Sequence, residues 1–373
     1  MRVKTRNLSV IWILLILNGL ISENLISANA DTEIILEEIG EIDTNGQLMD
    51  VIVRNNIAFL ADDLNGFYIY NISDPANPIE LFHNSSESHA NSIDIVDDLV
   101  FLGILFGGLT IYDISNLTAP VILGSYEDSG AIVDIQVVDD IVYLSDHGSA
   151  AEDTAGIKII DVSDPQNPFL IVNYRGGGKP SNLFVQNETV FSADYVYGFE
   201  MLNVSDLPSV HLYSKLARTS GFFGVYVENN YAYFTANNIE KGIHIYDVNN
   251  ISNPTPVNVF SMEGVPCDLQ VVDSIAYIAD GENGLSVIDV NNPYSPIHLG
   301  NFTDGGRPFD VEVCGNIVYV ADMDDGLEII EIVGWDENTV NGYNLLSLSA
   351  TFIPMLLAIR YLKKRREKSS MNI

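Results

Sequence analysis

Apolar and polar positions alternate along most of the chain in short runs that turn residues separate. In "DIQVVDDIVYLSD", residues 134–146, an alternating run, a two-residue polar turn and a second apolar run follow one another. A glycine-led run, "GIKIIDV", and a Ser-Asp-Pro turn then precede "PFLIVNY". Period-two alternation, β-branched and aromatic residues, and turn clusters between runs predict four short antiparallel strands in this unit.

The same unit recurs seven times, with spacings of 42 to 48 residues. Aligned first strands begin at residues 50, 92, 134, 182, 224, 268 and 310. Units of about 40–45 residues with four strands are typical of propeller blades. We find no convincing helix-period segment between residues 31 and 341. The sequence therefore predicts an all-β fold, a seven-bladed β-propeller over residues 31–333.

The seventh unit is one strand short, because it stops after "GLEIIEIV" at Val333. The segment "ILEEIGEIDT", residues 35–44, matches the fourth-strand pattern of "PIHLGNFTDG", with Gly40 aligned to Gly300. We therefore expect a 3+1 closure, in which the N-terminal strand completes the last blade and leaves no open sheet edge in the ring.

The repeats resemble a known family. The segments "GLTIYDISNLTAPVILGSY", "GIKIIDVSDPQNPFLIVNY" and "GLSVIDVNNPYSPIHLGNF" are similar to LVIVD repeats, and the resemblance covers residues 34–333. It implies an exported bacterial or archaeal β-propeller of undefined biochemical role. The fourth unit departs from the pattern ("FEMLNVSDLPSVHLYSKL"), and the seventh lacks the Ser-Asp-Pro turn, as expected of a closing blade.

The N-terminal 30 residues have the pattern of a secretory signal peptide. Arg2, Lys4 and Arg6 precede an apolar run over residues 8–21, and Ala28-Asn29-Ala30 forms a small-residue cleavage site. The alternative, a retained anchor, is less favoured because the run is shorter than the ~20 residues that a spanning helix needs.

The C-terminal end predicts a membrane anchor. After a linker over residues 334–342, residues 343–362 are long and apolar enough to cross a bilayer, and a basic tail over residues 363–373 follows. Basic residues favour the cytoplasmic side, so we expect a single-pass protein with the propeller outside the cell. The alternative, a buried core helix, conflicts with the basic tail. The end also resembles short archaeal C-terminal sorting signals, which would imply that the anchor is cleaved.

The part between these ends is strongly acidic. Residues 31–341 contain 8 of the 17 lysines and arginines and 49 of the 51 acids, a net formal charge of −41. Such a charge excludes nucleic acid and anionic membrane surfaces as binding partners, and it favours cations, basic partners or simple solubility.

The chain has two cysteines. In repeat phase Cys267 and Cys314 lie five positions apart, roughly 16 Å along a strand at ~3.3 Å per residue. A disulfide tolerates about 7 Å between Cα atoms, so we predict two free thiols.

Two sets of aspartates gather on one face. In a blade, the turn between the second and third strands and the loop that leads to the next blade open on the same face, here called the top face. One set begins innermost strands around the channel: Asp50, Asp134, Asp268 and Asp310. The other ends second strands: Asp62, Asp146, Asp194, Asp280 and Asp322. The first set is a candidate metal site for a hard cation such as Ca²⁺. The favoured alternative is that each carboxylate bonds its own turn or a neighbouring blade's backbone.

Residues that break the repeat are the candidate ligand-binding groups of the top face. The third unit is longer than the others and carries His147, Glu152 and Asp153 in its extra loop. Lys179 and Arg307 occupy equivalent positions just before innermost strands, where they are candidates to hold an anionic group. The alternative is that both pair with nearby aspartates.

No catalytic motif is present, since the histidines lack metal-ligand spacing and no nucleophile elbow or phosphate-binding loop occurs. We therefore expect a monomeric cell-surface binding or scaffold module for a protein or glycan partner, with Ca²⁺ as the candidate cation. The alternative is an extracytoplasmic metal-dependent hydrolase or lyase with its site at the channel mouth. A purely structural role in the envelope is the third hypothesis.

An exported chain with Asn-x-Ser/Thr sequences is a candidate glycoprotein. The acceptor positions are Asn71, Asn84, Asn116, Asn187, Asn203, Asn250 and Asn301.

Overall fold

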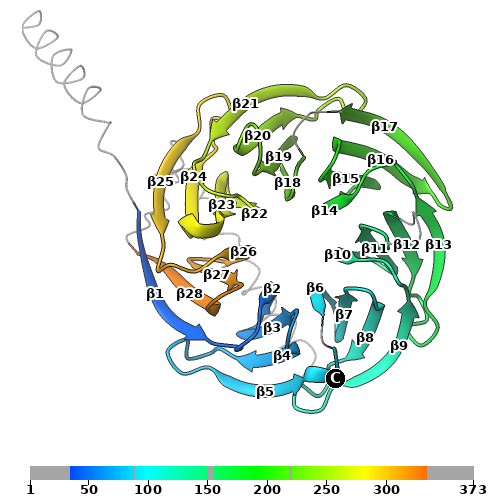
Figure 1. The fold of residues 1–373 in the computed structure, drawn as a ribbon, viewed down its shortest axis with the longest axis vertical. Helices are drawn as coiled ribbons and strands as arrows, with labels where there is room; N and C mark the ends of the chain where they lie inside the picture. The colour runs from blue at the N-terminus through cyan, green and yellow to red at the C-terminus, as the bar shows by residue number, and fades with distance from the viewer. Residues whose placement is uncertain (1–33, 88, 150–154, 218–220, 334–373) are drawn as a thin grey trace, which may run out of the picture. The chain divides into compact units, whose positions relative to one another are not determined.

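The computed structural model describes residues 34–333, apart from residues 88, 150–154 and 218–220. Within this part, seven four-stranded antiparallel sheets surround a central opening (Figure 1). The predicted all-β, seven-bladed propeller is thus confirmed. Two short 3₁₀ turns, η1 (Ser85–Glu87) and η2 (Gly281–Asn283), are the helical elements of the described residues.

In each blade the strands follow one another from the channel outward. The first blade comprises β2 (Leu48–Arg54), β3 (Ile57–Asp62), β4 (Gly66–Asn71) and β5 (Ile79–Asn84); the second β6 (Ala90–Val96), β7 (Leu99–Ile104), β8 (Gly108–Asp113) and β9 (Val121–Glu127); the third β10 (Ile132–Val138), β11 (Ile141–Asp146), β12 (Gly156–Asp161) and β13 (Phe169–Tyr174); the fourth β14 (Pro180–Gln186), β15 (Thr189–Asp194), β16 (Gly198–Asp206) and β17 (Ser209–Ala217); the fifth β18 (Val225–Glu228), β19 (Tyr231–Ala236), β20 (Gly242–Asp247) and β21 (Thr255–Ser261); the sixth β22 (Leu269–Val272), β23 (Ile275–Ala279), β24 (Leu285–Asp289) and β25 (Ile297–Phe302); and the seventh β26 (Pro308–Cys314), β27 (Ile317–Asp322), β28 (Gly326–Val333) and β1 (Ile35–Ile42).

The ring closes as predicted, because β1 is the outermost strand of the seventh blade. The order of that sheet is β1-β28-β27-β26, and Figure 1 shows the dark blue β1 beside the orange β28. The N–H of Ile34 also donates to the Leu299 carbonyl of β25, 3.1 Å away, and so ties the start of the described chain to the sixth blade. The first and last described segments of the chain therefore hold each other in place.

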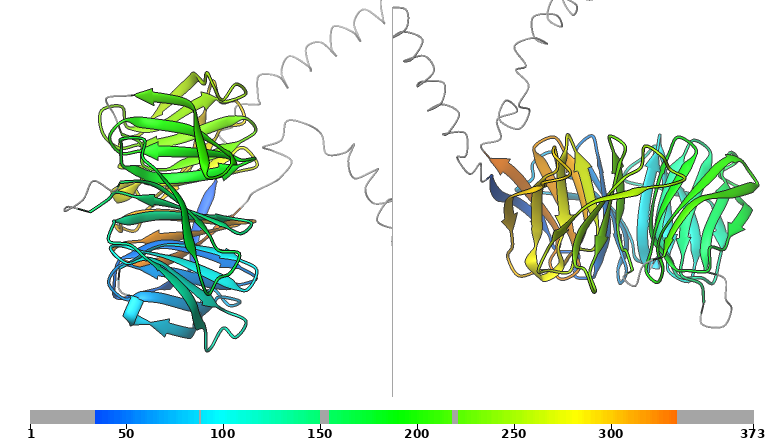
Figure 2. Two further views of the ribbon diagram at one scale, coloured as in Figure 1. Left: turned by 90° about the vertical axis from the view of Figure 1, so that its right-hand side faces the viewer. Right: turned by 90° about the horizontal axis from the view of Figure 1, so that it is seen from above.

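Apolar side chains fill the space between neighbouring blades. One cluster combines Phe199 and Met201 of the fourth blade with Phe222 and Phe234 of the fifth, and the rings of Phe199 and Phe234 stack with centroids 4.5 Å apart. Other clusters likewise join residues of successive blades, which lie side by side in Figure 2. Because each sheet buries both faces, no blade has a separate core of its own.

The aspartates that end second strands are structural. Asp62 is fully buried, and its Oδ1 accepts from the N–H groups of Leu64 and Asn65, at 2.9 and 2.7 Å. A Cβ on Gly46 would lie 2.1 Å from the same carboxylate, so only glycine fits there. This Gly–Asp pair occurs in five blades, as Gly46–Asp62, Gly130–Asp146, Gly178–Asp194, Gly264–Asp280 and Gly306–Asp322.

The other two blades lack both members of the pair. Ile104 and Ala236 replace the aspartate, and the sequence has Ser88 and Ser220 in place of glycine. The glycine and aspartate positions thus change together, as expected if the aspartate carboxylate must pack against a residue that has no side chain.

The Ser-Asp-Pro turns lie between third and fourth strands, at the end of the blade opposite the top face. In the third blade, Asp161 Oδ1 accepts from the backbone N–H of Ser163 at 2.9 Å, and Asp164 Oδ2 accepts from Asn167 Nδ2 at 2.8 Å. These bonds close the turn locally, as such residues commonly do.

Cys267 and Cys314 are both free, which confirms the prediction from the repeat frame. The predicted signal peptide, linker, membrane helix and basic tail lie outside the described residues. In the described part of the chain, no helix is long and apolar enough to cross a membrane.

Replacing Gly40 should weaken the closure of the ring. A Cβ at this position of β1 would lie 1.8 Å from the Pro75 carbonyl oxygen of the first blade. We expect Gly40→Ala to cost roughly 1–3 kcal/mol of unfolding free energy, as overpacking does, and to lower Tm by several degrees. Thermal unfolding followed by circular dichroism measures this. Glu37→Ala, at an exposed position of the same strand, is the control, and equal melting of the two variants would contradict the prediction.

Candidate functional site: a cavity at the channel mouth

A cavity of about 380 Å³ lies at the top-face mouth of the central channel. Innermost strands, the segments just before them, and second-to-third-strand turns contribute its walls, which confirms that these segments open on one face. The lining residues are Met49, Asp50, Asn91, Val133, Asp134, His147, Lys179, Ser181, Asn182, Tyr195, Phe223, Cys267, Asp268, Phe309 and Asp310.

Three of the four channel aspartates bond the backbone of the next blade. Each of Asp50, Asp134 and Asp310 accepts through Oδ2 from an N–H of the following innermost strand. The donors are Ile93 at 2.8 Å, Leu183 at 2.7 Å and Val51 at 3.1 Å, respectively. Asn182 does the same for Val225, at 3.0 Å. The alternative weighed in the sequence analysis, a bond to a neighbouring blade's backbone, is therefore realised at these aspartates.

A second layer of such bonds lies two residues further along the strands. Asp94 Oδ2 accepts from Val137 N at 2.6 Å, and Gln136 and Gln270 play the same part for Val185 and Val313, at 2.5 and 2.6 Å. Between the fourth and fifth blades the equivalent positions are Phe184 and Tyr226, whose ring centroids lie 4.8 Å apart. This layer was not predicted from the sequence, although "SIDIV", "DIQVV" and "DLQVV" each have a polar residue at its third position, which could have indicated it.

Asp268 departs from the pattern. Its Oδ1 accepts from its own neighbour, Leu269 N, at 2.8 Å, and its Oδ2 lies 3.4 Å from Asn182 Nδ2. The fifth blade has Gly224 where five others have an aspartate or asparagine and the second blade has Ser92, and a Cβ at Gly224 would lie 2.4 Å from Asp268 Oδ1. The missing side chain at Gly224 thus gives the Asp268 carboxyl the room to turn toward the cavity.

The cavity carboxyls are hard to ionise together. Burial, followed by the neighbouring Asp310 carboxyl, raises the pKa of Asp50 and of Asp268 well above the usual range. Burial also raises the pKa of Asp134 to about 8, against two backbone hydrogen bonds that lower it. A cation or a hydrogen-bond donor in the cavity would stabilise the ionised forms.

Two of the predicted candidates, His147 and Lys179, line the cavity together with the aromatic side chains of Tyr195 and Phe223. The ring of His147 lies 6.4 Å from that of Tyr195, which in turn meets Phe223 edge-on at 5.2 Å. His147 Nε2 is buried without a partner among the described residues. Burial and the Lys179 ammonium lower the pKa of His147, so the ring is neutral at pH 7. Lys179 is exposed and forms no ion pair with a described residue.

Arg307 is placed differently from Lys179. Its guanidinium makes a two-pronged ion pair with Asp324, with both N–O distances 2.6 Å, and it is not a lining residue. The structure therefore places Lys179, but not Arg307, at the cavity. Glu152 and Asp153 lie outside the described residues.

Four of the seven candidate glycan acceptors are exposed, namely Asn116, Asn187, Asn250 and Asn301. Asn71 and Asn203 are half-buried, and each accepts the N–H two residues on, at 2.9 and 2.8 Å. Asn84 is half-buried too and donates to the Tyr112 hydroxyl at 2.7 Å.

Comparison with family models gives matches to the LVIVD repeat. The matched segments are residues 45–84, 88–128, 130–175, 263–304 and 305–333. They cover all or most of the first, second, third, sixth and seventh blades, and the fourth and fifth blades lie outside them. No curated protein sequence matches significantly.

Solved structures support the fold alone. A catalytically inactive virginiamycin B lyase from Staphylococcus aureus, solved with quinupristin, is 11% identical over 81% of this chain and 100% of its own, with a TM-score of 0.65. The WD40 propeller of Doa1 is 10% identical over 82% and 99%, with a TM-score of 0.63. The WD40 domain of Neurospora crassa Pan2 is 10% identical over 82% and 98%, with a TM-score of 0.58.

Asp134→Asn should flatten the pH dependence of stability. An amide can still accept from Leu183 N, as Asn182 does for Val225. With a pKa near 8 in the folded state and about 4 unfolded, Asp134 holds a proton that the unfolded chain has released. Stability therefore falls as pH rises from 4 to 8, by up to about 1.4 kcal/mol per pH unit for one proton.

Melting curves between pH 5 and 8.5 measure this slope. Asp134→Asn should be less sensitive to pH than the unmodified chain and should melt higher at pH 8. Asp164→Asn, the same change in an exposed turn at the opposite face, should keep the original slope. An unchanged slope in Asp134→Asn would show that this carboxyl is ionised in the folded state.

Proposed function

The chain belongs to the LVIVD repeat family, and from this premise we propose that it is a binding scaffold whose channel-mouth cavity recognises part of a protein or glycan partner. The observation that carries the proposal is the combination of aromatic faces and hydrogen-bond acceptors in one concave site. Tyr195, Phe223 and Phe309 supply the rings, and Asp134 and Asp268 supply carboxyl oxygens.

This chemistry suits a ligand that has both an apolar face and polar hydrogens. Sugar rings carry hydroxyl donors, and lysine or arginine side chains carry N–H donors that also interact well with aromatic faces. The cavity volume of about 380 Å³ falls in the range of small-ligand sites, so it fits one protruding group of a larger partner rather than an extended surface.

The position of the irregular residues supports recognition over a purely structural role. Asn182, Tyr195 and Phe223 come from the fourth and fifth blades, which lie outside the segments that the family model matches. Asn182 takes part in the bonds between innermost strands that recur around the ring, whereas the aromatic side chains of Tyr195 and Phe223 occur once at the cavity. A rigid ring that presents one distinctive set of side chains is a common arrangement in binding proteins.

We propose that the site faces the outside of the cell. The acidic charge, the exposed Asn-x-Ser/Thr positions, and the sequence patterns of a signal peptide and a C-terminal anchor all support this location. On this proposal, the anchor holds the propeller at the membrane and the basic tail lies in the cytoplasm. The top face is then available to other cell-surface or extracellular molecules.

A second candidate function is a metal-dependent hydrolase or lyase. What favours it is the convergence of the Asp50, Asp268 and Asp310 carboxyls, with His147 Nε2 buried and unpartnered among the described residues nearby. Such a group of oxygens suits a hard cation such as Ca²⁺. Metal analysis of the purified chain separates the two functions, because an enzyme of this kind would retain an ion that Asp268→Asn releases.

Tyr195→Ala should weaken binding at the top face by about tenfold or more. Arrays of oligosaccharides and of lysine- or arginine-containing peptides, probed with the purified chain, supply the ligands. Tyr195 is 49% exposed beside the cavity, and truncating a central aromatic contact commonly costs 1–2 kcal/mol or more, about tenfold in affinity.

The control is Tyr294→Ala, an exposed tyrosine in a turn at the opposite face. It should bind the same spots as the unmodified chain. Binding that survives Tyr195→Ala and disappears in Tyr294→Ala would place the partner on the other face and contradict the proposal.

A further inference from the structure

The third residue of each glycine-led third strand is polar and buried in all seven blades. These side chains are 9% exposed or less: Tyr68, Thr110, Lys158, Glu200, His244, Ser286 and Glu328. They lie outside the channel cavity and take no part in the function proposed above. Because buried polar groups must be paired, each blade has to supply a partner at this place.

In the third blade the buried polar residue is a lysine, which forms ion pairs with two aspartates. Lys158, 3% exposed, places its ammonium between the carboxylates of Asp128, at 2.6 Å, and Asp146, which is closer still. Asp128 follows the outer strand of the second blade, and Asp146 is the aspartate that ends β11. One buried positive charge is therefore shared between two carboxylates.

The fourth blade has the opposite arrangement with the same outcome. Here the buried residue is an acid, Glu200, and Lys215 of the outer strand β17 forms an ion pair with it. Lys215 also donates to the Gly176 carbonyl oxygen, 2.7 Å away. A lysine thus neutralises the buried acid in this blade too.

The seventh blade has the acids of both arrangements and the lysine of neither. In repeat phase Asp304 corresponds to Asp128, Asp322 to Asp146, and Glu328 to Lys158. Its outer strand is β1, "ILEEIGEI", which contains three acids and no basic residue. Arg307, three residues after Asp304, is held by Asp324.

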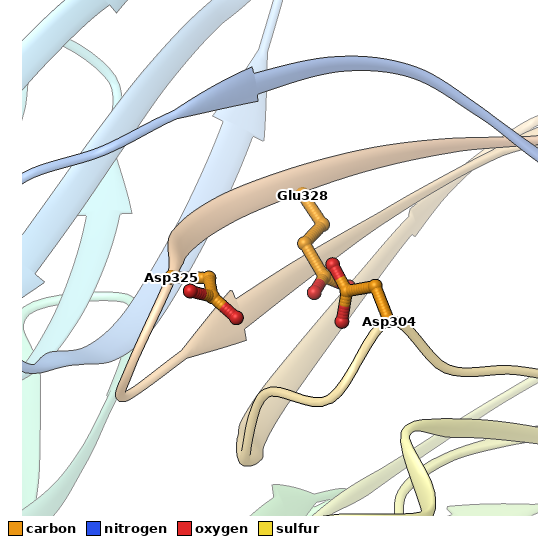
Figure 3. A group of neighbouring side chains, drawn as sticks. All are labelled: Asp304, Asp325 and Glu328. Carbon is orange, nitrogen blue, oxygen red and sulfur yellow. The ribbon is translucent and has the colours of Figure 1, made fainter.

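The acids of this blade converge without a basic partner among the described residues. Oxygen atoms of Asp304, Asp325 and Glu328 all lie within 4.8 Å of one another. Figure 3 shows the carboxyl of Glu328, from β28, facing that of Asp304, with Asp325 in the turn beside them. Glu328 is 2% exposed and both of its carboxyl oxygens lack a hydrogen-bond partner among the described residues, as does Oδ2 of the fully buried Asp322.

The electrostatics of the group agree with its geometry. Burial, then the carboxylates of Asp304 and Asp322, raise the pKa of Glu328 to about 9. Burying an acid among acids in this way is costly unless a positive charge joins them.

We propose that the seventh blade binds one Ca²⁺ ion between Asp304, Asp325 and Glu328, in the place that the Lys158 ammonium takes in the third blade. Carboxylate oxygens are the ligands that Ca²⁺ prefers, and its flexible coordination of six to eight oxygens leaves room for water beside the exposed Asp304 and Asp325. The ion connects the loop from the sixth blade, the β27–β28 turn and β28. It therefore stabilises the blade that closes the ring, independently of any ligand in the channel.

Thermal unfolding of the full-length chain, with EDTA or with added CaCl₂, tests the site. At a Ca²⁺ concentration about 100 times its Kd, Tm should rise by about 5 °C over the value in EDTA. Isothermal titration should show a Ca²⁺ site that Glu328→Lys lacks. Mg²⁺ at the same concentration should raise Tm less, because it dehydrates reluctantly and demands strict octahedral geometry.

Glu328→Lys is the decisive variant, since it copies the third blade. Its Tm in EDTA should exceed that of the unmodified chain, and Ca²⁺ should no longer shift it. Glu328→Gln removes the charge with little change in shape, and it should lose most of the Ca²⁺ shift even if the lysine does not fit. Glu331→Gln, the same change further along β28, and Asp134→Asn in the channel should both keep the full shift.

Two results would overturn the proposal. One is a chain whose Tm does not respond to Ca²⁺. The other is a Ca²⁺-dependent rise in Tm that persists in both Glu328→Lys and Glu328→Gln. If Asp134→Asn removed this rise, the ion would belong to the channel mouth.

Discussion

The inner strand of every blade is a sheet edge, and its unpaired backbone N–H groups need acceptors. In this propeller the acceptors are side chains of the preceding blade, such as Asp50 for Ile93 and Asp134 for Leu183. An exposed strand edge otherwise invites pairing with another chain, and a buried unpaired N–H is costly. These bonds fix the position of each blade relative to the next, and with it the shape of the channel mouth. Where the pattern fails, Gly224 leaves room beside Asp268, whose carboxyl lines the cavity instead of bonding the next blade.

Much of this fold could be predicted from the sequence, because a repeat turns many weak local signals into one strong one. The seven units, the closing strand and the separation of Cys267 from Cys314 all follow from aligning the repeats. Each predicted strand is supported by its equivalents in the other blades. The physical reason is that every blade must bury both faces of its sheet against its neighbours, and so keeps the same alternation.

The candidate sites were less predictable, because a site depends on which residues depart from the pattern and on where their atoms lie. The sequence indicated His147 and Lys179, but gave Arg307 equal weight, and only the structure places that guanidinium on Asp324. Tyr195 and Phe223 look like ordinary strand-end aromatics until the fold brings them to the channel mouth. The acids of the seventh blade were visible as a simple alignment of Glu328 with Lys158, yet their lack of partners is a matter of geometry.

The buried polar residue in each third strand also bears on how a chain of similar blades assembles in order. Several of these residues bond a group just after the preceding outer strand: Tyr68 reaches the Thr44 carbonyl and Lys158 reaches Asp128. Repeat proteins are prone to docking the wrong modules during folding, since neighbouring units present similar apolar faces. A third blade docked after a blade that lacks an acid at the position of Asp128 would bury an ammonium without its full set of carboxylates. Burying these polar side chains without their partners costs free energy, so they favour the docking of each blade onto its correct neighbour.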